Sequence, residues 1–337
     1  MPSAAMREAM YKAEVGDDVY GEDPTVNRLQ EACAQIAGKE GALFVASGTM
    51  GNLVSLLTHC GRGDEVILGD RSHIFCHEQG GCSALGGIHP RTLPNAADGT
   101  LAPEAVARAI RPDDPHCTRS RLLCLENTWN GRVLRPEYMA QIARVVRPHG
   151  LSIHLDGARI FNASVALALP VARLTEEVDS VQFCFSKGLA APAGSVVCGT
   201  SSFIKEARRA RKLVGGAMRQ VGVLAAACQV ALDTMVDRMA EDHANARKLA
   251  EGLADIPGIK LDTRTVETNI IFFSFDSVDA RADRFVEVLA DKGILMLAAS
   301  ATDVRAVTHY GIEPADINKA IKSVREALAE TKTLCPA

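Results

Sequence analysis

Aromatic residues make up only 4% of the 337-residue sequence, and Trp129 is its single tryptophan. The core must therefore consist mainly of aliphatic side chains, which the 47% hydrophobic content supplies. No apolar run is long enough to span a bilayer, and the N-terminus lacks the apolar core of a secretion signal. We therefore expect a cytoplasmic, globular protein with no membrane partner.

An excess of charge of one sign is also missing. The 37 basic residues nearly balance the 41 acidic ones, which gives a net charge of −4. This balance argues against nucleic acid as a partner. The ten cysteines form no CxxC pair, and most stand among apolar neighbours, so we expect reduced, buried thiols rather than disulfides.

The usual nucleotide-binding signatures are absent as well. There is no GxxxxGK[ST], and no GxGxxG follows a predicted strand. The apolar run ALFVAS (42–47) leads instead into SGTMGN (47–52) at the start of a predicted helix. Backbone N–H groups and a hydroxyl at a helix N-terminus suit a single phosphate, although an ordinary tight turn explains the same residues.

Short apolar runs alternate with helical stretches over most of the chain. The predicted strands are 42–47, 65–70, 121–127, 151–158 and 180–186, and the predicted helices are 23–37, 136–148 and 170–178. This alternation predicts an α/β fold with a large, doubly wound, mostly parallel sheet domain over 1–235.

The pattern changes toward the C-terminus. A long helix over 233–255, a strand at 268–275 and helices at 280–292 and 314–330 predict a smaller α+β domain over 236–337.

One charge interrupts the apolar segment QFCFSKGLAAPAGSVV (182–197). Lys187 is the only charged residue between Asp179 and Lys205. A lysine in a dry place has its ammonium form disfavoured and becomes available for attack on a carbonyl, whereas the alternative is a lysine that reaches solvent from a strand end.

An aspartate ends the preceding predicted strand. Asp156, in HLDGAR (154–159), stands where open α/β sheets bind ligands. It could hold a protonated ring nitrogen, bind a metal, or cap the next segment. Together with Lys187 and a phosphate cup at 47–52, it forms the pattern that pyridoxal phosphate requires.

A metal site competes with this interpretation at RSHIFCHEQGGC (71–82). His73 and His77 have i,i+4 spacing, but the glutamate of HExxH is missing. We therefore expect no metal, and we expect His73 to pack against a ring or touch substrate. The basic run KEARRARK (205–212) predicts a solvated helix face, whereas Arg219 in GGAMRQ predicts a close contact with an anion.

Several long motifs resemble, in the same order, those of the low-specificity L-threonine aldolases, which are fold-type I pyridoxal phosphate enzymes. The similarity runs from about residue 6 to residue 310. The motifs are GDDVYGEDPTVN (16–27), SGTMGN (47–52), LENTWNGRV (125–133), HLDGARIFNA (154–163), FCFSKGLAAPAGSVVCG (183–199) and GGAMRQVGVLAAA (215–227).

The resemblance implies a carbon–carbon lyase that cleaves L-threonine, L-allo-threonine and related β-hydroxy-α-amino acids by retro-aldol cleavage. The products are glycine and an aldehyde. A pyridoxal phosphate-dependent β-eliminating lyase and a non-catalytic cofactor-binding protein are the alternatives.

The resemblance also implies roles for the cofactor-binding residues. Lys187 holds the cofactor as an internal aldimine, and Asp156 holds the pyridine nitrogen. Gly48 and Thr49 cradle the phosphate, with Arg219 near it.

For the substrate, the resemblance implies that Arg159 and Arg305 hold the carboxylate and that His73 stacks on the cofactor ring. Tyr20 is placed near a site shared between subunits of a homotetramer built as a dimer of dimers. Many members carry histidine near the substrate hydroxyl where this chain has Trp129, so we expect His73, or a water that it holds, to be the base. The family's usual opening segment, Asp-Leu-Arg-Ser-Asp-Thr-like, has no counterpart in the sequence.

Overall fold

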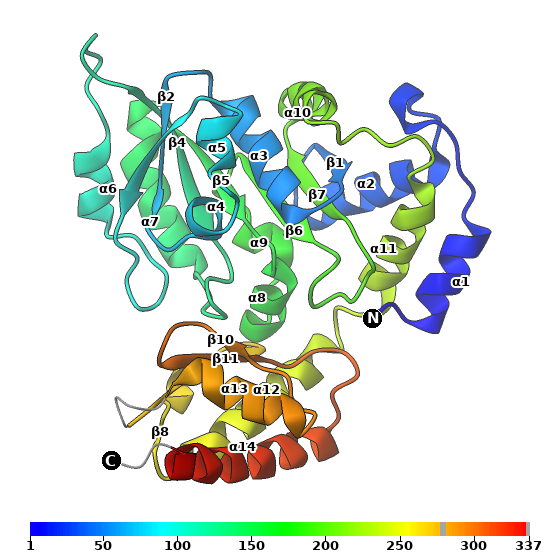
Figure 1. Cartoon of the computed structure of the whole chain (residues 1–337). Helices are drawn as coiled ribbons and strands as arrows, with labels where there is room; N and C mark the ends of the chain where they lie inside the picture. Colours follow the sequence, from blue (N-terminus) through cyan, green and yellow to red (C-terminus); the bar gives the residue numbers. More distant parts are fainter. Residues whose placement is uncertain (277–280, 335–337) are drawn as a thin grey trace. The chain divides into compact units, whose positions relative to one another are not determined.

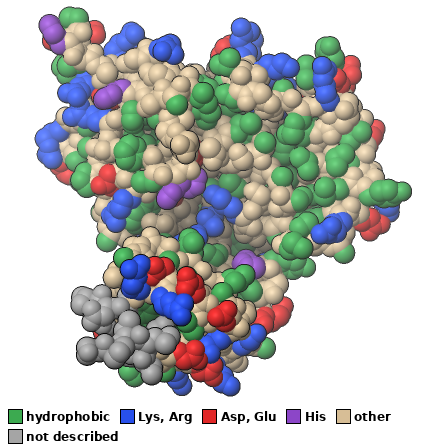
Figure 2. Space-filling view, in the orientation of Figure 1, with side chains coloured by type: hydrophobic (Ala, Val, Ile, Leu, Met, Phe, Trp, Pro, Cys, Tyr) green, Lys and Arg blue, Asp and Glu red, His purple; other side chains and the backbone are tan. Residues whose placement is uncertain are grey.

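The computed structural model describes residues 1–276 and 281–334, which form two compact units (Figure 1). The first unit comprises residues 1–129 and 133–236, and the second comprises 130–132 and the described residues from 237 onward. No helix of the described residues is long and apolar enough to cross a membrane. On the face seen in Figure 2, basic and acidic side chains are interspersed.

A seven-stranded sheet organises the first unit, with the strand order β1-β7-β6-β5-β4-β2-β3. Only β7 runs against its neighbours β1 and β6, while the other pairs are parallel. The expectation of an α/β fold with a mostly parallel sheet is therefore confirmed. The strands are β1 (Gly41–Val45), β2 (Asp64–Gly69), β3 (His89–Leu93), β4 (Arg119–Glu126), β5 (Ser152–Asp156), β6 (Ser180–Cys184) and β7 (Ser195–Gly199).

Helices flank this sheet (Figure 1). The α-helices are α1 (Ala4–Lys12), α2 (Pro24–Ile36), α3 (Gly48–His59), α4 (His73–Cys76), α5 (Gly81–Ala84), α6 (Pro103–Ala109), α7 (Pro136–Val146), α8 (Ile160–Leu167), α9 (Val171–Leu174), α10 (Ser201–Leu213) and α11 (Gly222–Thr234). Two 3₁₀ turns, η1 (Asp18–Tyr20) and η2 (Arg147–His149), complete the unit. The start of α2 follows from its sequence, because Asp23 accepts hydrogen bonds from two backbone N–H groups and Pro24 occupies the first position.

Aliphatic side chains from the strands and from α3 form the core of the first unit. Leu56 of α3 packs with Val66 and Leu68 of β2 and with Leu122 of β4, and all four are buried. The nine cysteines that the structure describes are free thiols, and most are buried. These thiols therefore act as small apolar side chains, as the sequence predicts.

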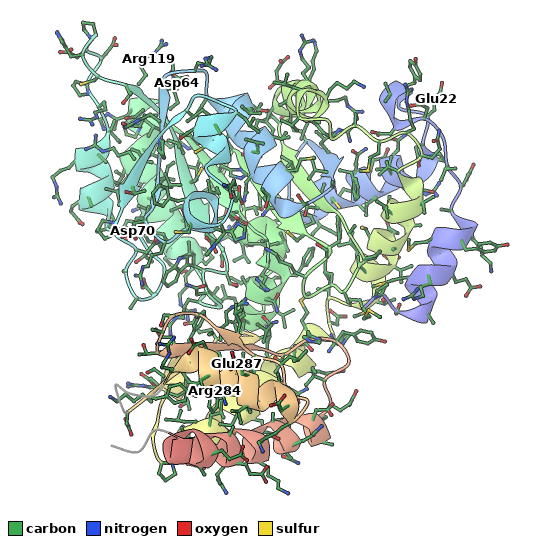
Figure 3. All side chains as sticks on the ribbon, in the orientation of Figure 1. Glu22, Asp64, Asp70, Arg119, Arg284 and Glu287 are labelled. Carbon is green, nitrogen blue, oxygen red and sulfur yellow. The ribbon has the colours of Figure 1, made fainter. Side chains whose placement is uncertain are left out.

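The parallel strands β2, β4, β5 and β6 end at one edge of the sheet. Asp64 and Asp70 mark the start and the position just after the end of β2 (Figure 3). At the starting edge, Nε of Arg119 on β4 lies 3.5 Å from Oδ1 of Asp64. At the ending edge, Glu126 of β4 and Asp156 of β5 are register partners. The carboxyl-terminal edge thus gathers the polar side chains that the sequence places after each strand.

The second unit contains a four-stranded antiparallel sheet in the order β10-β11-β9-β8, packed against helices. Its core includes Leu253, Phe273, Phe285 and Val324. Its elements are α12 (Met239–Ala254), β8 (Ile259–Lys260), η3 (Thr263–Thr265), β9 (Ile270–Phe275), α13 (Ala282–Asp291), β10 (Leu297–Ala298), β11 (Asp303–Val307) and α14 (Pro314–Leu334).

The helix predicted over roughly 233–255 is present as α12, but its predicted start is wrong. Helix α11 ends at Thr234, and α12 begins at Met239. No glycine or proline stands in the break, so the local sequence carries no stop signal there. The break coincides with the boundary between the two units.

Candidate active site

Lys187 lies just beyond β6, at the carboxyl-terminal edge of the sheet. Every residue of β6 is buried, and the Lys187 side chain is half-buried. The loop is fixed by a 3.0 Å hydrogen bond from the Ala190 N–H to the Lys187 carbonyl, with Ala190 at φ 61°. Among the described side chains, none forms a hydrogen bond or an ion pair with the Lys187 amine. The amine is therefore held at the strand end without a partner.

Asp156 ends the neighbouring strand β5 and is 3% exposed. Its Oδ1 accepts hydrogen bonds from the Ala158 N–H at 3.0 Å and from Nε2 of Gln182 at 2.5 Å. Its Oδ2 accepts a hydrogen bond from Nδ2 of Asn52 at 2.7 Å. The carboxylate thus caps its own turn and is also fixed by two buried amides, which leaves its direction little freedom.

The N-terminus of α3 presents unpaired backbone donors. The Ser47 hydroxyl caps the Met50 N–H, whereas the N–H groups of Gly48 and Thr49 have no partner among the described residues. A Cβ at position 48 would lie 2.7 Å from Sγ of Cys184, so only glycine fits this close approach. The turn therefore offers donors to an anion at the same edge of the sheet.

His73 opens the short helix α4, and its side chain is 36% exposed. Its Nδ1 lies 2.8 Å from Oε1 of Glu78, and this hydrogen bond raises the pKa of His73 above its ordinary value. The His77 ring lies 5.4 Å away in a tilted arrangement. Because Nδ1 is engaged by Glu78, Nε2 is the nitrogen available to a ligand.

The competing metal hypothesis involves the same neighbourhood. Ligand atoms of His73, Glu78 and Asp156 lie within 4.8 Å of one another. Hydrogen bonds among these groups account for the approach, because Glu78 accepts from both His73 and Asn52 while Asp156 accepts from Asn52. The neighbourhood is organised as a hydrogen-bond network.

The predicted arginines lie in different surroundings. Arg159 immediately follows the β5 turn, and its charge acts on Cys184 at the strand ends. Arg219 is exposed, pairs with Asp17 at 2.6 Å and lies 6.0 Å from the Tyr20 ring. The fold thus brings Arg219 and Tyr20, which are far apart in the sequence, into contact. Arg305 lies on β11 of the second unit.

Trp129 is 5% exposed. Its indole N–H donates to the Arg71 carbonyl at 3.4 Å, and the Arg71 guanidinium lies 5.0 Å from the ring centroid. A Cβ on Gly99 would fall 2.7 Å from the Trp129 Cβ, which shows how closely the 95–100 turn packs against it. The indole is thus a packed side chain of the loop after β4.

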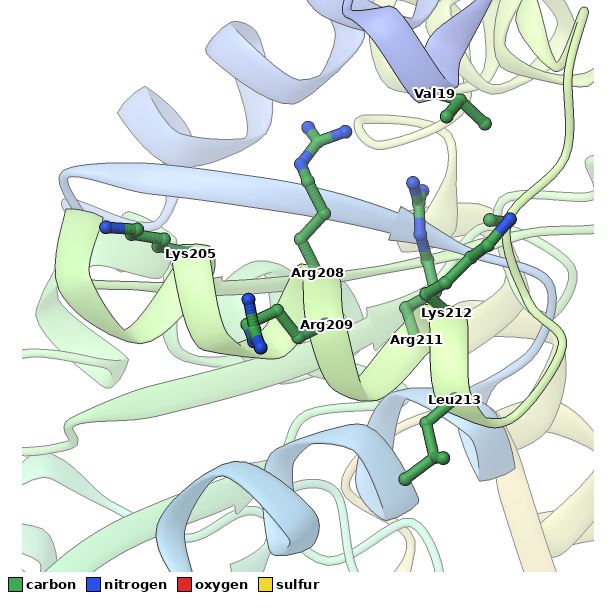
Figure 4. A pocket seen from close by; sticks show the side chains of 8 residues that line it. Val19, Lys205, Arg208, Arg209, Arg211, Lys212 and Leu213 are labelled. Carbon is green, nitrogen blue, oxygen red and sulfur yellow. The ribbon is translucent and has the colours of Figure 1, made fainter.

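A cavity of about 530 Å³ along α10 contains none of the predicted site residues (Figure 4). It is lined by Val19, Lys205, Arg208, Arg209, Arg211, Lys212, Leu213 and Ala217. Most of these cations are solvated, as the sequence predicts, but Arg211 is 2% exposed and pairs with Asp18 at 2.6 Å. Arg211 therefore anchors α10 to the N-terminal segment.

Glu126 is a site residue to which the sequence reasoning assigned no role. It ends β4, and its Oε2 accepts a 2.8 Å hydrogen bond from the His73 backbone N–H. Burial, with a further contribution from the negative charge of Asp156, raises the pKa of Glu126 to about 8. Lys187 opposes this rise in pKa, which places its charge near the same carboxyl group. Glu126 belongs to the quoted LENTWNGRV motif, and its place at a strand end was the available signal.

Asn52 and Glu78 were also missed as partners. Asn52 is the last residue of the SGTMGN motif, and Glu78 follows His77 in the histidine-rich segment. Both are buried and bonded to each other at 2.7 Å. Neither residue type alone indicates a site, and their partners lie far away in the sequence.

The chain is similar in sequence and in fold to known proteins. The model of the beta-eliminating lyase family matches residues 1–276. The chain is 47% identical to low-specificity L-threonine aldolase 1 of Arabidopsis thaliana, covering 97% of this chain and 93% of the relative. It is 46% identical to the low specificity L-threonine aldolase of Escherichia coli K12, covering 92% and 91%. The solved threonine aldolase of Leishmania major has the same fold, with a TM-score of 0.81, 21% identity and 96% coverage of each chain.

The raised pKa of Glu126 predicts a pH dependence of stability. The folded protein keeps the Glu126 proton up to about pH 8, whereas the unfolded chain releases it near 4.5, so this residue lowers stability as pH rises through that window. In ligand-free protein, we expect Glu126→Gln to reduce the fall in melting temperature between pH 6 and pH 9. Differential scanning calorimetry measures this, and the exposed Glu137→Gln serves as the control. An identical pH dependence in wild type and Glu126→Gln would contradict the assignment.

Proposed function

The chain belongs to the low-specificity L-threonine aldolases, a pyridoxal phosphate-dependent group within the beta-eliminating lyase family, and from this we propose that it cleaves L-threonine or L-allo-threonine to glycine and acetaldehyde. The observation that carries the proposal is that Lys187 and Asp156 stand at the ends of two adjacent parallel strands. Lys187, which has no partner among the described residues, follows β6, and Asp156, which is held by three N–H donors, ends the adjacent parallel strand β5.

The residues at this edge fit pyridoxal phosphate. Lys187 would hold the cofactor covalently, Asp156 would accept a hydrogen bond from the protonated ring nitrogen, and Gly48 and Thr49 would bind the phosphate. The unpaired N–H groups of α3 and the absence of an acidic partner for Lys187 among the described residues support this assignment. When bound, the cofactor supplies an electron sink for the pair of electrons released at Cα.

Arginines are the groups proposed to orient the substrate. Arg159 and Arg305 would bind its carboxylate through bidentate hydrogen bonds, which fixes the direction of the scissile Cα–Cβ bond. Arg219 would contribute positive charge near the phosphate, and Tyr20 would lie beside a site shared between subunits. Their cation–π contact is consistent with a common role for the two residues. Trp129 would limit the space near the β-hydroxyl.

His73 is proposed as the group that accepts the β-hydroxyl proton, directly or through a water. Its Nδ1 bond to Glu78 fixes the ring and leaves Nε2 to act. Stacking on the cofactor ring is compatible with its half-exposed position. Proton acceptance requires the neutral ring, so the raised pKa of His73 limits activity at low pH.

We propose a cytoplasmic homotetramer, a dimer of dimers, as the working form. The exposed Tyr11, Tyr20 and Leu213, which are 89%, 73% and 79% accessible, provide apolar surface that subunit contacts would cover. Light scattering on the purified protein tests this, because a monomeric mass would contradict it.

The lysine assignment predicts a spectroscopic and a chemical result. We expect purified protein supplied with pyridoxal phosphate to show the visible absorbance of a lysine-bound cofactor and to release glycine and acetaldehyde from threonine. Lys187→Ala should lose both, because the covalent attachment is gone, while the neighbouring cation variant Lys205→Ala should retain both. Retention of the band and the activity by Lys187→Ala would refute the proposal. Release of a 2-oxo acid and ammonia instead would favour the alternative function, a β-eliminating lyase. The name of the matching family model agrees with that alternative.

The proposed base predicts a shift in the acid limb of the pH profile. In the wild type, kcat/KM should fall as pH drops through a pKa above the usual 6.5 of histidine. Glu78→Gln removes the carboxylate that raises this pKa, so the limb should move to lower pH. Steady-state rates from pH 5 to pH 9 measure the shift. A limb at the same pH in both proteins would show that another group titrates.

A further inference from the structure

A continuous chain of side-chain hydrogen bonds, buried except at its outer end, leads away from the candidate site. Nε2 of His59 lies 2.8 Å from Oγ of Ser180, which lies 2.8 Å from Nδ1 of His154. Nε2 of His154 lies 3.1 Å from Oδ1 of Asn52, whose Nδ2 lies 2.7 Å from Oδ2 of Asp156. Ser180 and His154 are fully buried, and Asn52 is 1% exposed. We refer to these five residues as the His59–Asp156 chain.

The carboxylate end sets the direction of every hydrogen bond. Asn52 contacts Asp156 and Glu78, and carboxylates accept hydrogen bonds, so the amide nitrogen of Asn52 must face them. The amide oxygen therefore faces His154, whose Nε2 carries the hydrogen. Nδ1 of His154 must then accept from the Ser180 hydroxyl.

The same logic fixes the far end. Because the Ser180 hydroxyl hydrogen points to His154, its oxygen accepts from Nε2–H of His59. Both imidazoles are neutral, since burial lowers the pKa of His59 to about 4 and that of His154 to about 3. Neutral rings carry one hydrogen each, so a single orientation satisfies each contact without placing a positive charge in the core.

The amide of Asn52 also joins the two groups proposed to act in the reaction. Its Nδ2 donates to Oε1 of Glu78, and the same oxygen accepts from Nδ1 of His73. One amide thus links Asp156 at the end of β5 to His73 on α4. A rotation of this amide would turn its oxygen toward two carboxylates, which is electrostatically unfavourable.

We propose that Asn52, oriented by His59, Ser180 and His154, is a positioning residue that fixes Asp156 and the Glu78–His73 pair together. The inference rests on the proposed function, because Asp156 is taken as the partner of the cofactor ring nitrogen. The outer members of the chain, His59, Ser180 and His154, are linked to Asp156 only through Asn52. They act through the orientation of one amide.

Histidine tautomers test the direction of the chain without any reaction. In cofactor-free protein labelled with ¹⁵N, long-range ¹⁵N–¹H correlation should show His59 and His154 as neutral Nε2–H tautomers from pH 5 to pH 9. An Nδ1–H tautomer at His154 would overturn the proposal. This readout does not depend on Lys187, so a failed lysine test and a failed tautomer test remain distinguishable.

Activity with two cofactors tests the positioning role. Asn52→Asp keeps the shape of the side chain but replaces the amide donors with a carboxyl group. With pyridoxal phosphate we expect kcat to fall about tenfold or more, accompanied by a shift in the visible band. With the analogue that has carbon in place of the ring nitrogen, the fall in kcat should be clearly smaller, because Asp156 has lost its partner and only the effect through Glu78 and His73 remains. Equal losses with both cofactors, or no loss with either, would overturn the role.

A milder pair of variants covers the case in which Asn52→Asp does not fold. Ser180→Ala breaks the chain and should give a partial, few-fold fall in kcat with pyridoxal phosphate and a smaller fall with the analogue. Ser55→Ala is the matched control, since Ser55 is also fully buried but donates to the Gly51 carbonyl of its own helix. The control should keep both the rate and the His154 tautomer. Equal losses of kcat in Ser180→Ala and Ser55→Ala would mean that the hydrogen-bond chain contributes only to stability, and this would overturn the proposal.

Discussion

The burial of one carboxylate, that of Asp156, is the constraint on which the site depends. A carboxylate that is 3% exposed must be satisfied by donors within the fold. Those donors come from its own turn, from Gln182 on β6 and from Asn52 on α3. The helix must therefore approach the sheet closely enough for an asparagine side chain to reach the end of β5. The first turn of that helix, whose Gly48 and Thr49 N–H groups have no partner in the described part of the chain, is brought to the same edge.

The number of hydrogen-bond donors distinguishes two chemically similar groups at this edge. Glu126 and Asp156 are register partners at adjacent strand ends. Asp156 receives three N–H donors, whereas Glu126 receives one, from the His73 backbone. Desolvation therefore dominates at Glu126 and raises its pKa to about 8. One edge of the sheet thus holds an acceptor fixed by hydrogen bonds beside a carboxyl group that keeps its proton at neutral pH.

The sequence alone predicted the site residues that stand at the ends of apolar strands. Lys187 and Asp156 each follow an apolar run, and parallel strands must end at a common edge, so their approach could be predicted. The reversed strand β7 and the break between α11 and α12 could not, because no local residue signals either. The partners Asn52 and His154 lie 102 positions apart in the chain, and their contact depends on tertiary packing alone. The pKa of Glu126 likewise depends on burial, which a strand-end glutamate does not reveal.

The close approach of α3 to β6 has a consequence for how this sequence can change over time. A Cβ at Gly48 would lie 2.7 Å from Sγ of Cys184, and one at Gly51 would lie 3.2 Å from Cβ of Gln182. A larger side chain on the helix thus requires a smaller one on the strand, or the helix must move and carry Asn52 away from Asp156. We therefore expect paired substitutions at these positions to be tolerated more readily than single ones. The helix and the strand are therefore constrained to evolve as one unit.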